Sequence, residues 1–391
     1  MITPLQAEAL INDCSLHLEA ETILLEEAYN RVAAENLVAD TDLPPFNRVM
    51  MDGVALNYQA IESGRRSFVI QSMQRAGQPA ITLENTDQCI EIMTGAVCSY
   101  GCNTVVPYEH LRIEDGVAHI EIVPPVVGKN IHLQGSDKRI GDVLARAGSI
   151  LGAAEIGIAA SIGKHTLSVK RLPRVLICST GDELVEIDET PLAHQIRRSN
   201  AYALSALMRN LGIHASGMHL PDSADAVRES VSYGLNTYDV IILSGGVSKG
   251  KFDLLPEILS ELRVDSIFHG IAQRPGKPMW FGKSNRTVVF ALPGNPVSTL
   301  ACAARYVMPW MLKQMGRGAN TVHVALKQPV HPHEKLSLFV PVRIKQENGL
   351  STAEKLSNQG SGDFSALSGA DGFIEIEPRE VTDERYRFFP M

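Results

Sequence analysis

The chain has 391 residues, of which 45% are hydrophobic and 20% are charged, and its formal net charge is −8. These values are typical of a folded globular protein and exclude a disordered one, while the negative charge argues against nonspecific nucleic-acid binding. The length predicts two to four domains, and no apolar stretch reaches the ~18 residues that a membrane-spanning helix needs.

The six cysteines are scattered along the chain without a CxxC pair. They are too few for a disulfide framework in a chain of this length. Cys98 and Cys102 lack a second pair that would complete a metal site, so we expect buried or free thiols. The first residues, Met1-Ile2-Thr3-Pro4, carry no secretory signal pattern. We therefore expect a cytoplasmic protein without a membrane partner.

The first region is predicted to be helical. Apolar residues recur at helical spacing twice in residues 3–39, around Leu10 and again around Val32, which predicts two helices. Residues 141–170 are expected to return to the same domain after an insertion. We thus predict a split helical and linker domain made of residues 1–46 and 136–171.

The intervening residues 47–135 are predicted to form an inserted β-rich domain. Short runs with high strand propensity alternate there with turns that contain Gly, Pro and Asn. The expected strands cover residues 68–73, 89–93, 104–106 and 117–123.

Strands and helices alternate in residues 172–317, which indicates a doubly wound α/β domain. Three helices are expected over residues 200–211, 224–235 and 296–314, capped by Ser199, by Asp222 or Ser223, and by Asn295. From residue 318 to 391 the pattern changes to short β runs, such as 322–326 and 339–344. These predict a compact C-terminal β domain that resembles a barrel.

Three apolar runs, residues 175–178, 240–243 and 288–292, each end in a polar turn that contains glycine. Because the runs do not alternate with polar residues, they predict strands buried on both faces of a parallel sheet. Ligands bind outside the carboxyl ends of such strands. The glycines, amides and carboxylates of these turns suit a compound that combines phosphate with a metal ion.

Three acidic residues, Glu183, Asp222 and Asp253, follow strands or turns that are expected at one edge of the sheet. Clustered carboxylates without thiolates favour a hard divalent cation, so we predict that they hold Mg²⁺ shared with a substrate phosphate. An alternative stays open at this point: Asp222 could simply cap a helix and Glu183 could be a solvated turn residue.

The same turns offer candidate anion donors. Ser244-Gly245-Gly246-Val247-Ser248 would present backbone N–H groups, and Pro293-Gly294-Asn295-Pro296-Val297-Ser298 begins a helix whose first amides favour an anion. Arg274 and Lys277 lie on a turn stiffened by prolines and suit an oxyanion. Each motif alone is more often an ordinary turn, and it is their order behind successive βα units that favours binding.

In the β-rich region and just after it, Asp52, Thr94 and Asp137 are further candidates in loops or at strand ends. Taken alone, Asp52 is better explained as a turn former and Thr94 as a capping hydroxyl, and Asp137 is similarly ambiguous. A Ser-His-Asp triad stays open, although no nucleophile elbow and no ordinary nucleotide-binding loop occurs in the sequence.

Six motifs occur in one order along nearly the whole chain: Met51-Asp52-Gly53-Val54-Ala55, Met93-Thr94-Gly95-Ala96, Ser179-Thr180-Gly181-Asp182-Glu183-Leu184, Ser244-Gly245-Gly246-Val247-Ser248, Arg274-Pro275-Gly276-Lys277-Pro278 and Leu292-Pro293-Gly294-Asn295-Pro296-Val297-Ser298. Together they resemble the MoeA family of molybdopterin molybdenumtransferases, which includes the E domain of gephyrin. The resemblance implies that the α/β domain binds molybdopterin. It also implies a homodimer in which Asp52, Thr94 and Asp137 reach a cleft of the partner subunit.

The implied reaction takes adenylylated molybdopterin and molybdate, releases AMP and leaves molybdenum on the dithiolene. Mg²⁺ is the implied cofactor, molybdate is a substrate, and an adenylyltransferase is an implied supplier of the pterin substrate. Under this resemblance Glu183, Asp222 and Asp253 serve the metal and pyrophosphate, Asp52 is also catalytic, and the other candidates bind substrate.

Several positions depart from the family pattern. His132 stands where many members carry Arg, and Arg198 stands where Asp is usual. Lys249 and Lys251 add cations after the glycine turn, and Arg274 replaces a common Lys. These departures leave a tungstate-handling variant open. A non-catalytic module that binds molybdopterin or a partner is the alternative from another class.

Overall fold

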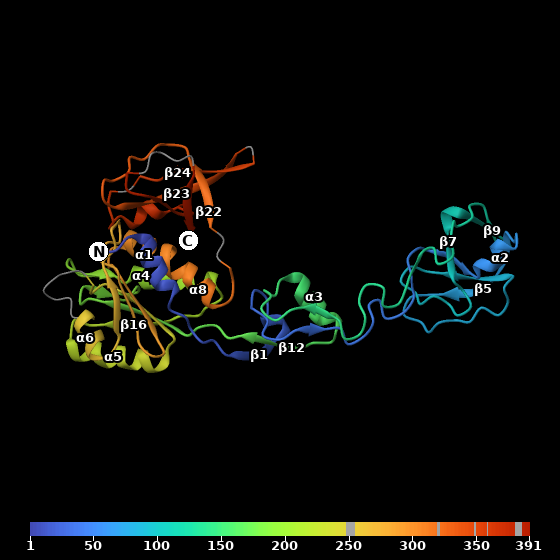
Figure 1. The fold of residues 1–391 in the computed structure, drawn as a ribbon, viewed down its shortest axis with the longest axis horizontal. Coiled ribbons are helices and arrows are strands. Elements are labelled where there is room, and N and C mark those ends of the chain that lie inside the picture. The colour runs from blue at the N-terminus through green and yellow to red at the C-terminus, as the bar shows by residue number, and fades with distance from the viewer. Residues whose placement is uncertain (248–254, 319–320, 348, 358, 380–384) are drawn as a thin grey trace. The chain divides into compact units, whose positions relative to one another are not determined.

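The computed structural model describes residues 1–247, 255–318, 321–347, 349–357, 359–379 and 385–391. Two compact units can be distinguished (Figure 1). The first comprises Met1–Thr22, Asn30–Val32 and Ser168–Met391, and the second comprises Ile23–Tyr29 and Ala33–Leu167.

The first unit contains a six-stranded sheet with the order β16-β13-β17-β21-β20-β18. Four neighbouring strands are parallel: β16 (Ser216–Leu220), β13 (Val175–Thr180), β17 (Val240–Ser244) and β21 (Val288–Leu292). The antiparallel strands β20 (Trp280–Lys283) and β18 (Asp265–His269) complete the sheet. Every residue of β13, β17 and β21 is buried, as the unbroken apolar runs predict.

Helices cover both faces of this sheet, so the predicted doubly wound α/β fold is confirmed. On one face Val175 and Ile177 pack in a core with α1 (Pro4–Asn12), α4 (Ser199–Asn210), α7 (Pro296–Cys302) and α8 (Met308–Gln314). On the other face Leu176 and Cys178 pack with α5 (Ala224–Thr237) and α6 (Leu255–Glu261). Successive strand residues thus enter opposite cores, which is the reason the strands show no polar alternation.

The three predicted helices of this region are present, but their caps differ in detail. Arg198, not Ser199, is the N-cap of α4, and Ser223 is the N-cap of α5. Asn295 occupies the N-cap of α7 without a capping hydrogen bond from its side chain. The third helix runs from residue 296 to 314 through a π-helical turn at Ala303–Val307.

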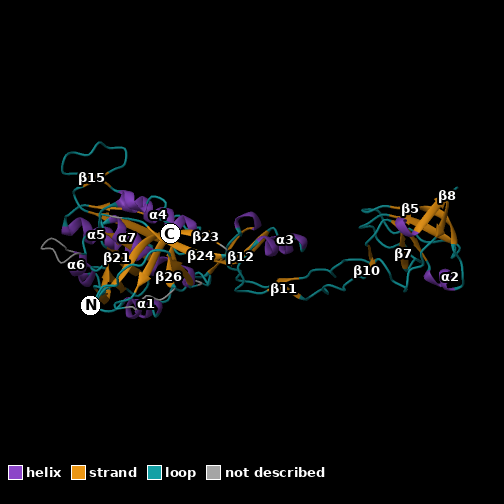
Figure 2. Ribbon diagram, turned by 90° about the horizontal axis from the view of Figure 1, so that it is seen from above, coloured by secondary structure: helices purple, strands orange, loops and turns teal. Residues whose placement is uncertain are grey.

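The C-terminal strands form a closed barrel of five strands, which confirms the expected barrel-like domain. Some of these strands are labelled in Figure 2. Its order is β23-β24-β22-β26-β25, and β25 pairs back with β23. The strands are β22 (Val322–Leu326), β23 (Ser337–Glu347), β24 (Leu350–Lys355), β25 (Gly372–Ile376) and β26 (Tyr386–Pro390). A further short strand, β19 (Gln273–Arg274), runs parallel to β23 and attaches the Arg274 turn to the barrel.

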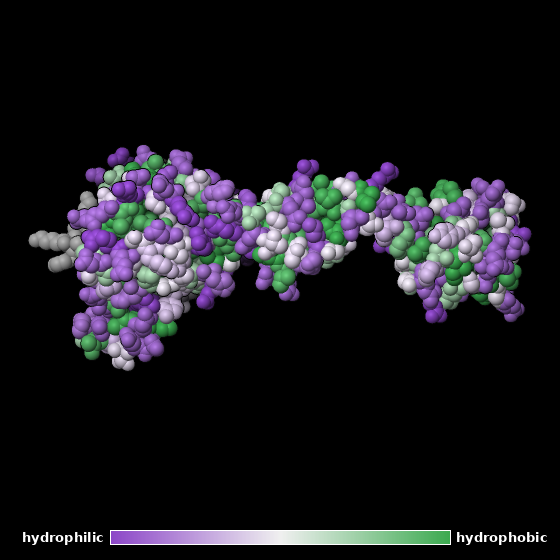
Figure 3. Space-filling view, turned by 90° about the horizontal axis from the view of Figure 1, so that it is seen from below, coloured by the Kyte–Doolittle hydropathy of each residue, from purple (hydrophilic) through white to green (hydrophobic). Residues whose placement is uncertain are grey.

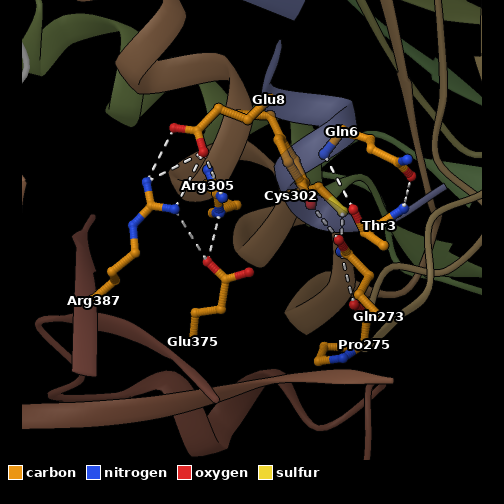
Figure 4. A network of polar contacts seen from close by, with 10 residues as sticks. Thr3, Gln6, Glu8, Gln273, Pro275, Cys302, Arg305, Glu375 and Arg387 are labelled. Atoms are coloured by element: carbon orange, nitrogen blue, oxygen red, sulfur yellow. Dashed lines mark hydrogen bonds and ion pairs between the residues drawn. The ribbon is translucent and has the colours of Figure 1, made fainter. Parts of the chain in front are cut away.

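A buried ionic network holds α1, the π-helical turn and the barrel together (Figure 4). Arg305, whose side chain is 1% exposed, donates to Glu375 Oε2 at 3.0 Å and to Glu8 Oε2 at 2.9 Å. Arg387 donates to Glu8 Oε1 at 3.0 Å. Burial raises the pKa of Glu375, although the two arginines act against this rise. These ion pairs connect three segments that are distant in the sequence, and each arginine is paired with a glutamate.

The second unit contains a six-stranded sheet with the order β7-β4-β6-β5-β9-β8. Its strands are β4 (Gly53–Leu56), β5 (Ser67–Gln74), β6 (Gln88–Ile92), β7 (Thr104–Pro107), β8 (Leu111–Glu114) and β9 (Val117–Ile120). The four strands expected in residues 47–135 are therefore present. The unit also holds the helices α2 (Tyr58–Glu62) and α3 (Ala153–Ser161), the short strands β3 (Arg48–Val49) and β10 (Ile131–His132), and the pair β2 (Leu37–Val38) and β11 (Val143–Ala145).

The second helix predicted in residues 3–39 is wrong. This part of the chain forms β1 (Ala20–Leu24), a single 3-10 turn and β2. The partner of β1 is β12 (Thr166–Lys170), and the division between the units falls inside these two strands. Ala28, Val32 and Ala33 are buried as their apolar character suggests. Their spacing gave no sign of a strand partner more than a hundred residues away.

No helix in the described part of the chain combines the length and the apolar composition needed to cross a membrane. The face shown in Figure 3 carries hydrophilic residues across both units, interspersed with smaller apolar areas.

Candidate functional site

A pocket of about 660 Å³ opens at the carboxyl ends of β13 and β17. After β13 the chain continues to β16 on one side of that strand, and β17 then pairs on its other side. The pocket therefore lies at a topological switch point, where doubly wound sheets bind ligands. It is lined by Ser179, Thr180, Gly181, Glu183, Leu184, Ile196, Arg197, Arg198, Ser199, Asn200, Asp222, Ser244, Gly245, Gly246, Val247, Pro278, Pro293, Gly294, Asn295, Pro296 and Gly362.

The three strand-ending turns singled out in the sequence meet in this pocket. Ten predicted site residues line it: Glu183, Asp222, Ser244, Gly245, Gly246, Val247, Pro293, Gly294, Asn295 and Pro296. Ser298 is buried within α7 and is not part of the lining. The predicted residues Ser248 and Asp253, together with Lys249 and Lys251, lie outside the described residues.

Glycine is required at the turn after β17. Gly245 has a φ of +100° and Gly246 a φ of +69°, which side chains rarely adopt. A Cβ added to Gly245 would lie 2.6 Å from Thr180 Oγ1. The Gly245 amide itself donates to Leu292 O at 3.0 Å, so the turn is locked to the end of β21. This amide is consequently engaged within the protein rather than held ready for an anion.

Asn200, at the start of α4, connects two of the turns. Its Nδ2 donates to Ser244 Oγ at 2.9 Å and to Gly294 O at 2.7 Å. No sequence motif pointed to this residue as part of the site. The only local signal was its place directly after Ser199, where the polar segment enters a helix.

The carboxylates at the pocket lie on the loops after β13 and β16. The Glu183 side chain folds back over Gly181, where an added Cβ would collide with it. Asp222 N donates to Asp182 Oδ1 at 3.0 Å, and Asp182 N faces Asp222 Oδ2 at 3.5 Å, so the two loops hold each other. His219 Nε2 bonds to Gly181 O at 2.9 Å and fixes the same turn.

The residues at this edge fit a hard divalent cation in their chemistry. Glu183 and Asp222 offer carboxylate oxygens and Ser179 offers a hydroxyl, while no thiol is found among the described residues that line the pocket. Within the described ranges, no three His, Cys, Asp or Glu side chains are already clustered as a metal site. The third predicted ligand, Asp253, lies outside those ranges.

Two polar atoms of pocket residues have no hydrogen-bond partner in the described part of the chain: Ser179 Oγ and Arg198 Nε, both buried. Buried polar groups in folded proteins are nearly always satisfied. Such atoms in the wall of a pocket therefore point to a bound ligand or ordered water. Neither residue was selected as a binding residue from the sequence.

The turn that carries Arg274 and Lys277 is held in place by the buried residue Gln273. Gln273, which is 1% exposed, accepts a bond from Tyr306 Oη at 2.5 Å and donates to Pro275 O at 3.0 Å (Figure 4 shows Gln273 and Pro275). Both predicted cations are exposed, and only Pro278 from this turn reaches the pocket lining.

The barrel also contributes to the pocket through Gly362. Asn295 Nδ2 donates to Ser361 Oγ at 2.9 Å, and Val297 N donates to Ser361 O at 3.1 Å. The first amides of α7 are thus partly used by the C-terminal domain. This contact corrects the expectation that the side chain of Asn295 caps its own helix.

In the second unit Asp52 and Thr94 are in direct contact. Asp52 Oδ1 accepts bonds from Thr94 Oγ1 and Thr94 N, both at 2.6 Å. These bonds lower the pKa of Asp52, so the carboxylate is ionised at neutral pH. Asp137 contacts His132, with Oδ1 2.7 Å from Nε2, and Arg48 Nη2 lies 3.3 Å from the other ring nitrogen of His132.

The fold and this pocket define a multidomain α/β protein with a polar pocket at the switch point of a parallel sheet. Three family models match the chain: the MoeA N-terminal region (domains I and II) over residues 2–163, a probable molybdopterin binding domain over residues 176–313, and the MoeA C-terminal region (domain IV) over residues 323–384. The chain belongs to the MoeA family, as its motifs indicate.

Individual relatives agree with this assignment. The chain is 39% identical to the molybdopterin molybdenumtransferase of Synechocystis sp. over 95% of its own length and 94% of that protein. It is 28% identical to the protein of the same name from Haemophilus influenzae, over 96% and 95%. Two structures of the molybdopterin biosynthesis MoeA protein from Pyrococcus horikoshii are 26% identical, with TM-scores of 0.84 and 0.81, and cover this whole chain and 99% and 98% of theirs.

Proposed function

We propose that this chain is a molybdopterin molybdenumtransferase, a transferase of molybdenum cofactor biosynthesis. It would insert molybdate into adenylylated molybdopterin and release AMP. The family membership over nearly the whole chain supports the transferase class. The observation that carries the proposal is the pocket in which the three strand-ending turns meet at the switch point.

Each part of the pocket has a role in this proposal. Glu183 and Asp222, with Asp253, would hold Mg²⁺, which when bound supplies charge neutralisation at the pyrophosphate. The turns at Ser244–Val247 and Pro293–Ser298 would bind the pterin and its phosphate. Asn200 holds two of these turns at fixed separation through its bonds to Ser244 and Gly294, and so presents a preformed site.

The cationic turn would act at the rim. Arg274 and Lys277 are exposed on a turn whose base is fixed by the buried Gln273, so their side chains can reach an approaching anion. Molybdate and the substrate phosphates are both oxyanions and favour such cations.

The second unit would contribute Asp52, Thr94 and Asp137 to the pocket of a partner subunit in a homodimer. The Asp52–Thr94 contact supports this role, because it holds an ionised carboxylate in a defined orientation at an exposed position. We also propose a cytoplasmic location and delivery of the pterin substrate by an adenylyltransferase.

The test of the reaction is AMP release from adenylylated molybdopterin in the presence of Mg²⁺ and molybdate. The wild-type protein is expected to release AMP only when both are present, and Asp222→Asn and Asp253→Ala are expected to lower the rate at least ~100-fold. Asp225→Asn is the matched control, because Asp225 lies on α5 three residues away and pairs with Arg228. Tight pterin binding without molybdate-dependent AMP release would favour the non-catalytic alternative, and replacing molybdate by tungstate tests the preferred oxyanion.

Subunit mixing tests the shared cleft separately. Asp52→Ala and Asp222→Ala proteins would each be inactive alone, whereas a randomly mixed sample would regain about a quarter of the wild-type rate, since half of its dimers carry one intact site. No recovery after verified subunit exchange would show that both residues act within one chain.

A further inference from the structure

Arg198 is a pocket residue with an unusual environment. It follows β15 (Ile196–Arg197), is the N-cap of α4 and lines the pocket. Its backbone N–H donates to Val185 O at 3.1 Å, which fixes the position from which the side chain extends. The side chain is only 12% exposed, so a permanently charged group is largely removed from water.

The guanidinium of Arg198 has a hydrogen-bond partner for one of its nitrogens, while another buried nitrogen has none among the described residues. Nη2 donates to Glu186 Oε2 at 2.7 Å. Nε is buried and has no hydrogen-bond partner among the residues that the structure describes. A guanidinium carries five N–H donors in a rigid plane, and leaving a buried one unsatisfied costs free energy.

The ion pair with Glu186 leaves the Nε donor of Arg198 unused. Glu186 is 47% exposed, and a pair with an exposed acid contributes little to stability. The neighbouring Arg197 shows the ordinary case, because it is exposed and its Nε donates to Glu189 O at 3.1 Å. Of these two adjacent arginines, the buried one is the one whose Nε is unsatisfied.

We propose that Arg198 binds a tetrahedral oxyanion of the substrates through its Nε, and that Glu186 orients the guanidinium for this contact. The oxyanion is either a phosphate of the adenylylated pterin or molybdate, which are both negatively charged and both arrange their oxygens tetrahedrally. The planar fork of arginine matches such groups. The inference rests on the proposed function and names Arg198 as a determinant of substrate binding in the same pocket.

The test is calorimetric binding of inorganic pyrophosphate and, separately, of molybdate, to the full chain with Mg²⁺ present. Arg198→Ala is expected to weaken binding of the recognised oxyanion about 10- to 100-fold. Arg198→Lys, which keeps the charge but has no Nε, is expected to fall between Arg198→Ala and wild type. A loss confined to pyrophosphate assigns the contact to phosphate, and a loss confined to molybdate assigns it to molybdate.

Two further variants separate recognition from charge and from folding. Arg209→Ala removes the same charge from the exposed last turn of α4, and its affinity for both oxyanions is expected to match wild type. Glu186→Gln is expected to weaken binding less than Arg198→Ala, because the guanidinium remains but loses its charged anchor.

Urea denaturation of each variant completes the experiment. If Arg198→Ala and Arg198→Lys bind both oxyanions as wild type does, the proposal is overturned, and a fall in stability alone would assign Arg198 a structural role. AMP release by the wild-type protein is measured independently. Failure of AMP release with Arg198-dependent oxyanion binding would therefore reject the proposed reaction while leaving this contact in place.

Discussion

The two ends of the parallel sheet each carry a polar pocket, and they differ in how their charges are satisfied. The pocket at the amino ends is the larger, with a volume of about 860 Å³ against about 660 Å³ at the carboxyl ends. At the amino ends Asp239 accepts two bonds from Arg171, at 2.6 and 3.0 Å, and one from Arg174 N at 2.8 Å. At the carboxyl ends Ser179 Oγ and Arg198 Nε have no partner within the described ranges.

The two ends therefore differ in how their polar groups are satisfied more than in pocket volume or in the presence of charged residues. Burial alone would raise the pKa of Asp239, but the bonds from Arg171 and Arg174 hold it below its usual range. Those charges compensate one another and hold the loops before β13 and β17 together. The two polar atoms of the carboxyl-end pocket that lack a partner among the described residues are, in contrast, open to a ligand or ordered water.

The largest effect on stability is expected from a substitution at the amino ends of the parallel strands. Asp239→Ala should destabilise the protein by about 3 kcal/mol, because it leaves the partly buried Arg171 and the Arg174 amide without their acceptor. Urea denaturation measures the loss, and Asp265→Ala, an exposed acid of the same pocket, should stay within about 0.5 kcal/mol of wild type. If Asp239→Ala instead weakened pyrophosphate binding without changing stability, the amino ends would also have to be a ligand site.

The pH dependence of the same group sharpens the comparison. Because its folded-state pKa is lowered, Asp239 contributes stability that is fully present above its unfolded pKa of about 3.9 and is lost as the pH falls through the folded value. The stability difference between wild type and Asp239→Ala should therefore be constant from pH 7 to 5 and shrink below about pH 4. If the stability difference between wild type and Asp239→Ala stayed constant down to the pH at which the protein unfolds in acid, the ionised carboxylate would not be what stabilises the amino ends of the sheet.

At the carboxyl ends, Asn200→Ala should mainly affect binding. It removes the bonds to Ser244 and Gly294 that hold two turns in place, so pyrophosphate affinity should fall about 10-fold. Asn210→Ala, at the exposed far end of the same helix, is the control and should bind as wild type does. Unchanged affinity in Asn200→Ala would mean that the turns keep their geometry without this bridge.

The smallest change in stability is expected for Ser179→Ala. Removing a buried hydroxyl that lacks a partner should leave stability unchanged or raise it by up to ~1 kcal/mol, while oxyanion binding weakens. Ser99→Ala removes a comparable buried hydroxyl in the second unit, so it should match the stability effect without changing affinity. A clear loss of stability in Ser179→Ala would show that the hydroxyl is satisfied inside the protein.

Much of the fold followed from local sequence patterns, but one element did not. Buried parallel strands form at the apolar runs of residues 175–178, 240–243 and 288–292. A strand that is covered on both faces needs apolar residues at successive positions, so its sequence shows no polar alternation. The helix expected around Val32 failed, because pairing between β1 and β12 depends on a segment far along the chain. The spacing of apolar residues indicates that a residue is buried, but it does not indicate which segment of the chain covers it.

The sequence by itself determined the family, the strand-ending turns and ten of the residues that line the pocket, because glycine turns and the order of motifs along the chain are read directly from the residues. Only the tertiary structure decided the contacts of Asn200, Ser361 and Arg198. Asn200 bridges turns that are 44 and 94 residues away, and Ser361 is 66 residues from Asn295. Hydrogen bonds over such separations, and a donor left without one, exist only after the chain has folded.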